Sequence, residues 1–218
     1  AMLRHSKGVV ESVDYHNGKN KGDNMNTAEP IREPEELERF KNYYAYEKPN
    51  IRNYTLLCIG LNTALRISDM LMLRWGDVYD FEKNKFRNHI QLSEQKTGKH
   101  SSIYMNKNVI DTLKYYKFVT SSNGEITHEQ YLFKGYHGNS LTRVQAWRII
   151  KQAAEACNVP GVISPHSLRK TFGYQAWQHG VPPVMLMEIY NHSSFKITKR
   201  YLGIQQDDRD EIFKNICI

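Results

Sequence analysis

Six polar residues interrupt stretches of this chain that otherwise have the pattern of a protein core. Each carries a side chain that can hold a phosphate, move a proton or form a covalent bond. The six are Arg66, Lys96, His166, Arg169, His192 and Tyr201. The sequence shows no accompanying Asp/Glu cluster with metal-ligand spacing. The set therefore favours work on a phosphodiester by a route that needs no metal.

Each residue type has a definite use in that chemistry. Two arginines can grip the non-bridging oxygens of a phosphate bidentately and stabilise the charge that builds on it. Tyr201 can attack as a covalent nucleophile. Lys96 lies at the turn of a predicted hairpin and can protonate the departing 5′-oxygen, and the two histidines can supply hydrogen bonds or proton transfer.

Taken singly, these residues have ordinary structural explanations. Arg66 can pair with Asp69, three residues further along a helix, for a few tenths of a kcal/mol. Lys96 can be a solvated turn lysine, and His166 a helix-start residue after Pro165. Tyr201 is one of fourteen tyrosines, most of which must serve packing. Only the combination, in this order, points to catalysis.

Four motifs containing these residues resemble those of the tyrosine recombinase (phage integrase) family. LRISDMLMLRWGDV is similar to its first-arginine box and EQKTG to its hairpin lysine. HSLRKTF is similar to its H-x-x-R box, and NHSSFKITKRYLG to its final His-then-Tyr box. The resemblance covers about residues 34–205.

Two positions depart from the family pattern. Ala64 stands where the family usually has glycine before Leu-Arg, and Tyr190-Asn191 replaces the usual Leu-Gly before the second histidine. If these positions need a left-handed backbone, asparagine tolerates it next best after glycine, whereas alanine fits it poorly. Neither departure removes a catalytic group.

The resemblance implies DNA strand exchange by a site-specific recombinase or integrase, through a 3′-phosphotyrosine intermediate and without metal, cofactor or ATP. The six residues above would be catalytic, and Asp69 would orient the arginines. The partner would be double-stranded DNA at a specific recombination site. The predicted tail helix 205–217 would dock into a neighbouring subunit of a DNA-bound tetramer, and accessory DNA-bending or directionality proteins would assist.

Three other functions are compatible with parts of the pattern. A type IB topoisomerase shares the chemistry but religates the same strand. A DNA-binding module that has lost catalysis would not need all six groups. A metal-dependent nuclease using His166 and His192 would need carboxylates that the sequence does not offer.

The periodicity of the chain predicts mostly helix with one small sheet. Short alternating runs over residues 78–105 predict a small antiparallel meander, and SDMLMLRW predicts a short helix. The fold class is mainly α with a small antiparallel β-sheet (α+β), and the resemblance implies the catalytic-domain fold of the DNA breaking-rejoining enzymes. The remaining helices are expected at 34–47, 51–61, 107–119, 141–157, 166–179, 182–190 and 207–216.

Composition sets the domain plan and the class of partner. The 218 residues suffice for one substantial domain, which we expect at 31–218 after a flexible arm or linker at 1–30. The net charge of +7 favours a polyanionic partner. The chain has no apolar run of membrane-spanning length and no signal-peptide pattern, and three scattered cysteines predict neither disulfides nor zinc. We expect a bacterial, cytoplasmic, nucleoid-associated protein, either an excised catalytic domain or a naturally short recombinase.

Overall fold

The computed structural model describes residues 28–93, 98, 100–204, 213 and 214. Within these residues, four strands form the β-structure: β1 (Tyr79–Asp80), β2 (Lys85–Phe86), β3 (His89–Ser93) and β4 (His100–Tyr104). A short 3-10 turn, η1, spans Tyr136–Gly138. The helices are α1 (Pro34–Tyr46), α2 (Ile51–Thr63), α3 (Ile67–Leu71), α4 (Trp75–Val78), α5 (Lys107–Ser121), α6 (Arg143–Ala156), α7 (Pro165–Gln178), α8 (Pro183–Tyr190) and α9 (Phe195–Leu202).

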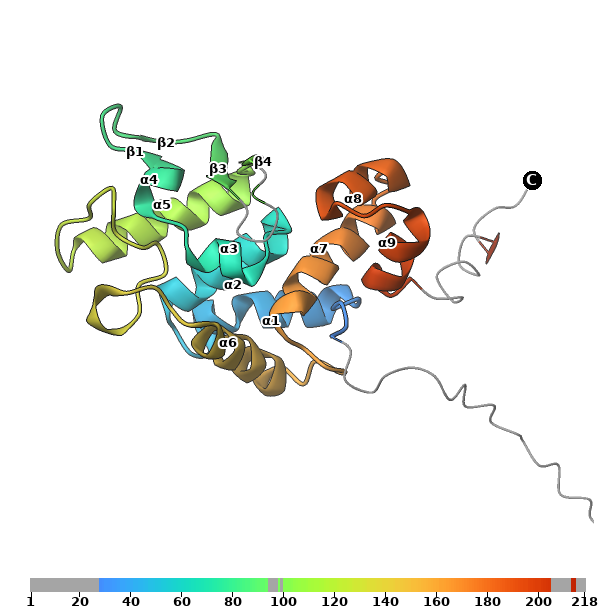
Figure 1. Ribbon diagram of the computed structural model, residues 1–218. Helices are drawn as coiled ribbons and strands as arrows, with labels where there is room; N and C mark the ends of the chain where they lie inside the picture. The colour runs from blue at the N-terminus through green and yellow to red at the C-terminus, as the bar shows by residue number, and fades with distance from the viewer. Residues whose placement is uncertain (1–27, 94–97, 99, 205–212, 215–218) are drawn as a thin grey trace, which may run out of the picture.

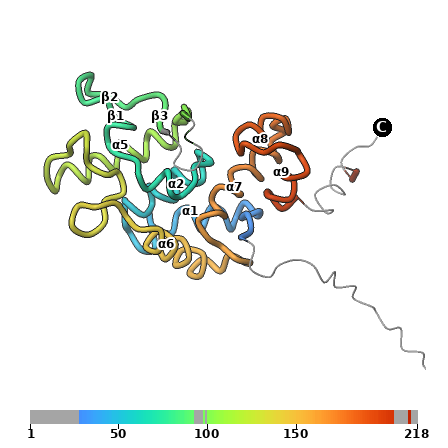
Figure 2. Tube along the Cα trace, viewed as in Figure 1, coloured from blue at the N-terminus to red at the C-terminus, as the bar shows by residue number. Residues whose placement is uncertain are grey.

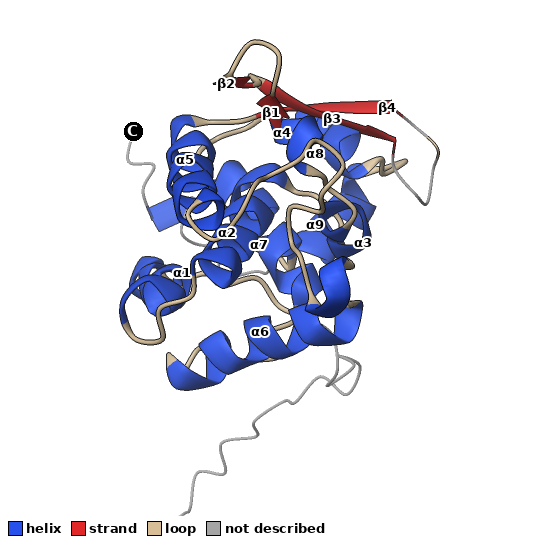
Figure 3. Ribbon diagram, turned by 90° about the vertical axis from the view of Figure 1, so that its left-hand side faces the viewer, coloured by secondary structure: helices blue, strands red, loops and turns tan. Residues whose placement is uncertain are grey.

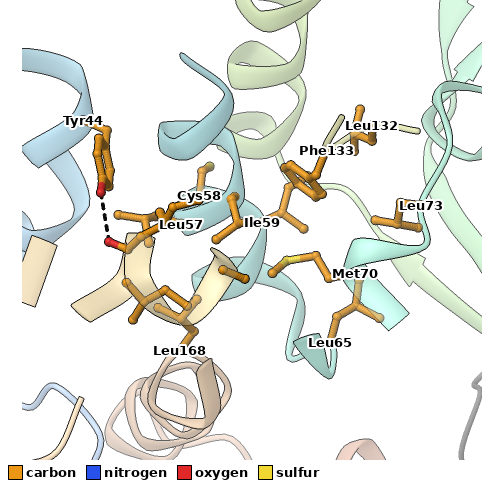
Figure 4. Close-up of a cluster of buried hydrophobic side chains, with 14 of the residues drawn as sticks. Tyr44, Leu57, Cys58, Ile59, Leu65, Met70, Leu73, Leu132, Phe133 and Leu168 are labelled. Atoms are coloured by element: carbon orange, nitrogen blue, oxygen red, sulfur yellow. Dashed lines mark hydrogen bonds between the residues drawn. The ribbon is translucent and has the colours of Figure 1, made fainter. Parts of the chain in front are cut away.

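Helix α2 forms the centre of the molecule because it is apolar on every side. Its consecutive residues Leu56, Leu57, Cys58 and Ile59 are fully buried, and a helix of this kind must be covered by neighbours all round. Helices α1, α5 and α7 pack against it. Figure 4 shows α2 side chains inside the large hydrophobic cluster that we call the main core.

Gly60 allows α7 to approach α2 closely. A Cβ atom at this position would lie 2.6 Å from Cδ1 of Leu168 and 3.3 Å from its Cβ. Only a glycine therefore leaves room for Leu168, which stands in the first turns of α7. This close contact fixes the end of α7 on which two of the predicted catalytic residues lie.

The strands form two separate antiparallel ribbons. β1 pairs with β2 and β3 pairs with β4, in a register that runs from His89 opposite Tyr104 to Ser93 opposite His100. Figure 3 shows both ribbons at one end of the molecule, with α6 at the opposite end. Lys96 lies in the sequence between β3 and β4.

A second, smaller hydrophobic cluster lies where α7, α8 and α9 meet. Its buried members are Ala64, Leu186, Tyr190, Leu202 and Ile204, and we call it the C-terminal core. Figures 1 and 2 show α8 and α9 side by side on one side of the molecule, joined to the rest by α7. The C-terminal helices thus have their own small core beside the main one.

Residues 28–32 form a strap across the C-terminal helices. The ammonium group of Lys170 on α7 donates a hydrogen bond to the carbonyl of Ala28 at 2.6 Å. The guanidinium of Arg32 donates to the carbonyl of Gly203, the residue that ends α9. The strap therefore joins α7 to the end of α9.

The predicted fold class is confirmed, with three differences in detail. The predicted helix SDMLMLRW is helical only as far as Leu71, where α3 ends, and α4 begins at its last residue, Trp75. The single meander is two ribbons, and α9 was not predicted. The predicted tail helix and most of the predicted arm lie outside the described residues. No helix in the described part is long and apolar enough to cross a bilayer.

Candidate active site

A left-handed turn after α2 brings Arg66 next to α7. Ala64 adopts φ 53° and ψ 16°, a conformation that glycine takes freely and alanine seldom does. Its carbonyl accepts a hydrogen bond from Nη1 of Arg169. After this turn Arg66 precedes α3 in an extended conformation, so the turn places both arginines at one site.

Asp69 supports Arg66 from within the protein. Its side chain is almost completely buried, and its Oδ2 lies 3.9 Å from Nη1 of Arg66. A buried carboxylate beside a partly exposed guanidinium restricts that guanidinium to few orientations. This geometry agrees with the orienting role that we predict for Asp69.

The first turn of α7 presents His166 and Arg169 on one face. Pro165 occupies the first helical position, and the backbone N–H of Ser164 donates to Oγ of Ser167 at 3.0 Å. Residues three apart on a helix are neighbours on its surface. Arg169 is buried, whereas His166 is exposed, so the pair spans from the interior to the surface of the site.

The turn between α8 and α9 places His192. Asn191 ends α8 in a left-handed conformation, with φ 55° and ψ 47°. Nδ1 of His192 then lies 3.0 Å from Oγ1 of Thr198, a buried residue of α9. This hydrogen bond occupies Nδ1 and fixes the orientation of the imidazole ring.

Tyr201 lies on α9 with its ring against two aromatic neighbours. Its ring centroid is 5.3 Å from that of His192, edge to face, and 5.2 Å from that of Tyr190. Burial raises the pKa of the Tyr201 hydroxyl, while Arg169, through its charge and a side-chain hydrogen bond, and Arg66, through its charge, lower it. The net pKa of Tyr201 is raised by burial, and the two arginines offset part of that rise in favour of the phenolate.

Both histidines are surrounded by positive charge. Partial burial and the charges of Lys170, Arg169 and Arg66 lower the pKa of His166 below 6.5. Burial and the charges of Arg169 and Arg66 likewise lower the pKa of His192. Both imidazoles are therefore neutral at neutral pH, and each can accept a proton or a hydrogen bond.

A cavity of about 580 Å³ opens beside these groups. Arg66, Asp69 and Arg169 line it together with residues of β4 and α8. A larger cavity of about 860 Å³ lies between α1, α2 and α5, and no predicted catalytic residue lines it. The smaller cavity is the one that adjoins the predicted catalytic residues, and the two arginines in its lining, Arg66 and Arg169, can hold a phosphate.

The structure brings five of the six predicted catalytic residues to one place. The charge of Arg66 acts on His166, His192 and Tyr201, and so does that of Arg169. Lys96 lies outside the described residues, and its place in the site stays a prediction. Within the described residues no group of three or more His, Cys, Asp or Glu side chains could hold a metal ion.

Sequence reasoning missed three side chains that contact the site. Thr198 holds His192, and the ammonium group of Lys170 lies 5.3 Å from the centroid of the Tyr201 ring. Tyr190 stacks on His192 with ring centroids 5.6 Å apart. Tyr190 and Lys170 each adjoin a recognised motif residue, and that adjacency is the signal that could have found them.

Comparison with known proteins agrees with this geometry. The model of the phage integrase family matches residues 32–207. The chain is 36% identical over 191 residues to the probable integrase/recombinase YoeC of Bacillus subtilis, covering 87% of this chain and 97% of YoeC. It is 26% identical over 167 residues to the tyrosine recombinase XerD of Staphylococcus saprophyticus, covering 73% of this chain and 55% of that protein.

Solved structures share the fold at low sequence identity. XerA recombinase superposes with a TM-score of 0.69 at 19% identity, covering 86% of this chain and 63% of XerA. XerH bound to its palindromic difH substrate gives 0.68 at 18% identity, covering 87% of this chain and 53% of XerH. The chain thus spans roughly half to two thirds of these longer proteins. With a family model matching most of its length and a relative above 30% identity, the chain belongs to the phage integrase family.

Proposed function

We propose that this protein is a site-specific DNA recombinase that cuts and rejoins DNA through Tyr201. The convergence of Arg66, Arg169 and two neutral histidines around one tyrosine carries the proposal. The tyrosine recombinase names of its relatives support it.

The proposed reaction is a pair of transesterifications. The oxygen of Tyr201 attacks the scissile phosphorus, the bond from phosphorus to the 5′-oxygen breaks, and a 3′-phosphotyrosine and a 5′-hydroxyl result. A 5′-hydroxyl from the partner duplex then attacks the phosphotyrosine and releases the tyrosine. Each step exchanges one phosphoester bond for another, so no external energy source is required.

The proton movements follow from the chemistry of the side chains. A neutral imidazole can take the phenolic proton of Tyr201, and His166 and His192 are both neutral at neutral pH because their pKa values are lowered. The 5′-oxygen must gain a proton as it leaves, and we assign that donation to Lys96. The arginines stabilise the charge on the phosphate between these events.

The partner that we propose is double-stranded DNA carrying a specific recombination site. Structural neighbours include recombinases bound to DNA, among them XerH with difH and lambda integrase with a core site. We further propose a tetramer on DNA joined through the tail 205–217, assisted by accessory DNA-bending or directionality proteins. Such a protein would act on the bacterial nucleoid.

Covalent capture tests the proposal. The protein is incubated in EDTA with nicked duplexes made from host DNA, so that a short leaving strand diffuses away and traps the intermediate. SDS-resistant adducts are collected and sequenced. We expect adducts from the native chain and none from Tyr201→Phe. Tyr136→Phe is the matched control, since Tyr136 is 84% exposed and outside the site.

Other outcomes identify the alternatives. Adducts that persist with Tyr201→Phe would show that another tyrosine is the nucleophile. A complete lack of adducts would leave a DNA-binding module, and cleavage abolished by EDTA would indicate a metal-dependent nuclease. Relaxation of plasmids without recombinant products would indicate a topoisomerase.

A further inference from the structure

Tyr190 touches three of the predicted catalytic residues at once. The guanidinium carbon of Arg169 lies 4.7 Å from the centroid of its ring. The ring of His192 stacks on it at an interplanar angle of 25°, and the ring of Tyr201 lies 5.2 Å away. These three partners come from α7, from the turn after α8 and from α9.

The hydroxyl of Tyr190 anchors the ring in this position. It donates a hydrogen bond of 2.7 Å to the backbone carbonyl of Arg169. The residue is only 2% exposed. Gly173 provides the space, because a Cβ atom there would lie 2.3 Å from the Tyr190 hydroxyl. The hydroxyl end of the ring is thus held by α7, and the rest of the ring is buried in the C-terminal core.

We propose that Tyr190 is a positioning residue for the recombination chemistry, a platform that sets Arg169, His192 and Tyr201 at fixed angles to one another. The inference rests on the proposed function. An aromatic face attracts a guanidinium and stacks on an imidazole, so it defines the orientation of both planar groups. A leucine at this position would fill the space without imposing an orientation.

The position of Tyr190 lets it orient catalytic groups in addition to filling space. Arg169 is the buried arginine of the site, and its head group must lie where the phosphate binds. Small displacements of such groups reduce rates strongly even when binding persists. Loss of the ring should therefore affect the rate of cleavage more than the affinity for DNA.

Two variants separate the platform from simple filling of the core. Tyr190→Phe keeps the aromatic face and loses only the hydrogen bond to Arg169. Tyr190→Leu removes the face. Tyr174→Leu is the matched control, because Tyr174 is also a buried tyrosine and lies against Arg32 and Trp177.

The first readout is single-turnover cleavage of the captured DNA at saturating protein, beside the Kd for that DNA. We expect Tyr190→Leu to slow cleavage by about 10- to 100-fold with Kd little changed, and Tyr190→Phe to recover most of the rate. Equal rates for the native chain, Tyr190→Leu and Tyr174→Leu would overturn the proposal. Should Tyr190→Leu fail to fold, Tyr190→Met supplies a second aliphatic side chain of similar length.

The second readout needs no DNA and so separates this inference from the proposed function. The ring protons of His192 are titrated by NMR. The groups that face this ring are Arg66, Arg169, Tyr190, Thr198 and Tyr201. We expect the pKa of His192 to rise toward 6.5 in Tyr190→Leu, because a leucine side chain covers less of the imidazole face than the stacked phenol ring does, and to stay low in Tyr190→Phe.

The two readouts fail in different ways. If the native chain forms no adduct, the proposed function is wrong, while the titration of His192 still tests the contact with Tyr190. If adducts form but neither the cleavage rate nor the His192 titration responds to Tyr190→Leu, the residue only fills the core.

Discussion

At the scale of single residues, Ala64 and Asn191 adopt the same left-handed conformation by different means. Ala64 is buried in the C-terminal core, and its carbonyl accepts from Arg169, so its surroundings hold a conformation that alanine disfavours. Asn191 is exposed and belongs to a residue type that tolerates left-handed backbone. Alanine therefore does not disturb the turn before Arg66, because this hydrogen bond and burial hold its left-handed backbone.

Replacing Asn191 tests this account of the turn. We expect Asn191→Ala to lower the free energy of unfolding by about 1 kcal/mol, because an exposed alanine has no neighbour to hold it left-handed. Asn191→Gly should remain within a few tenths of a kcal/mol of the native chain. Chemical denaturation measures both, with Ser193→Ala, an exposed neighbour, as the control. Equal stability for the alanine and glycine variants would contradict the account.

The lowered pKa values of the two histidines predict how stability depends on pH. Because the pKa values of folded His166 and His192 lie below the ordinary 6.5, the unfolded chain binds more protons as the pH falls. The contribution of the two histidines to the free energy of unfolding should therefore be fully present above pH 6.5 and decrease as the pH falls below it. Urea unfolding between pH 5 and 8 measures the slope.

Substitution of the histidines distinguishes this effect from general acid denaturation. His166→Gln combined with His192→Gln should flatten the slope between pH 5 and 6.5, whereas a variant of the exposed His137 should leave it unchanged. An identical slope in all three proteins would show that the two histidines titrate normally. The rate of DNA cleavage should be maintained to below pH 6.5, because the two histidines stay neutral there.

At the scale of elements, the contact between α7 and the C-terminal helices depends on Gly173. Glycine in a helix interior is normally about 1 kcal/mol less favourable than alanine, so Gly173→Ala would stabilise an isolated helix. In this structure a Cβ atom would lie 2.3 Å from the Tyr190 hydroxyl and 2.5 Å from Cδ2 of Leu202. We expect destabilisation by about 1–3 kcal/mol instead.

A double-mutant cycle checks the cause. In the Tyr190→Leu background the Gly173→Ala substitution should cost less, because the clashing hydroxyl is gone. Thermal unfolding of the two single variants and the double variant gives the coupling. Additive effects would show that Leu202, and not Tyr190, sets the limit at this contact.

Most of the longer elements could be predicted from the sequence. Helices α1, α2, α5, α6, α7 and α8 follow from apolar periodicity, and the motifs located five residues that the fold brings together. Helix α9 was missed although it is as long as α8, and it contains the β-branched Ile197 and Thr198, which have low helix propensity. It forms because Thr198 and Leu202 are buried against its neighbours, and this burial outweighs the low local helix propensity.

The same reason applies to the site. The motifs that resemble the family predicted a set of catalytic residues, and the fold brings five of the six together. The motifs did not predict Tyr190 as the common neighbour of these residues, because that contact joins three elements and depends on space left by Gly173. The two-ribbon arrangement of the strands likewise depends on packing and not on the alternation of residues.

At the scale of the whole molecule, the predicted catalytic residues lie on both sides of a boundary between two cores. Arg66 and Asp69 adjoin the main core, whereas His192 and Tyr201 belong to the elements around the much smaller C-terminal core. Segments with few buried apolar contacts open more readily than central ones. The position of Tyr201 relative to the arginines therefore depends on how firmly α9 is held.

The strap at residues 28–32 is one of the means that hold it. Arg32 donates to the carbonyl of Gly203 at the end of α9, and the backbone N–H of Ile31 donates to Oγ1 of Thr171 on α7 at 2.9 Å. The strap is thereby connected to α9, the helix that carries Tyr201. Loosening the strap should increase local opening in α9 before it does so in other helices.

Hydrogen exchange measures this coupling. We expect backbone amides of α8 and α9 to exchange faster than those of α2, which is buried on every side. Arg32→Ala should increase exchange in α9 by about 5- to 10-fold, since it removes a hydrogen bond to the helix end, and leave α2 unchanged. Arg39→Ala, an exposed arginine on α1, is the control. Uniform acceleration throughout the chain would mean that Arg32 stabilises the fold as a whole, whereas acceleration confined to α9 would show that the strap specifically restrains the helix that carries Tyr201.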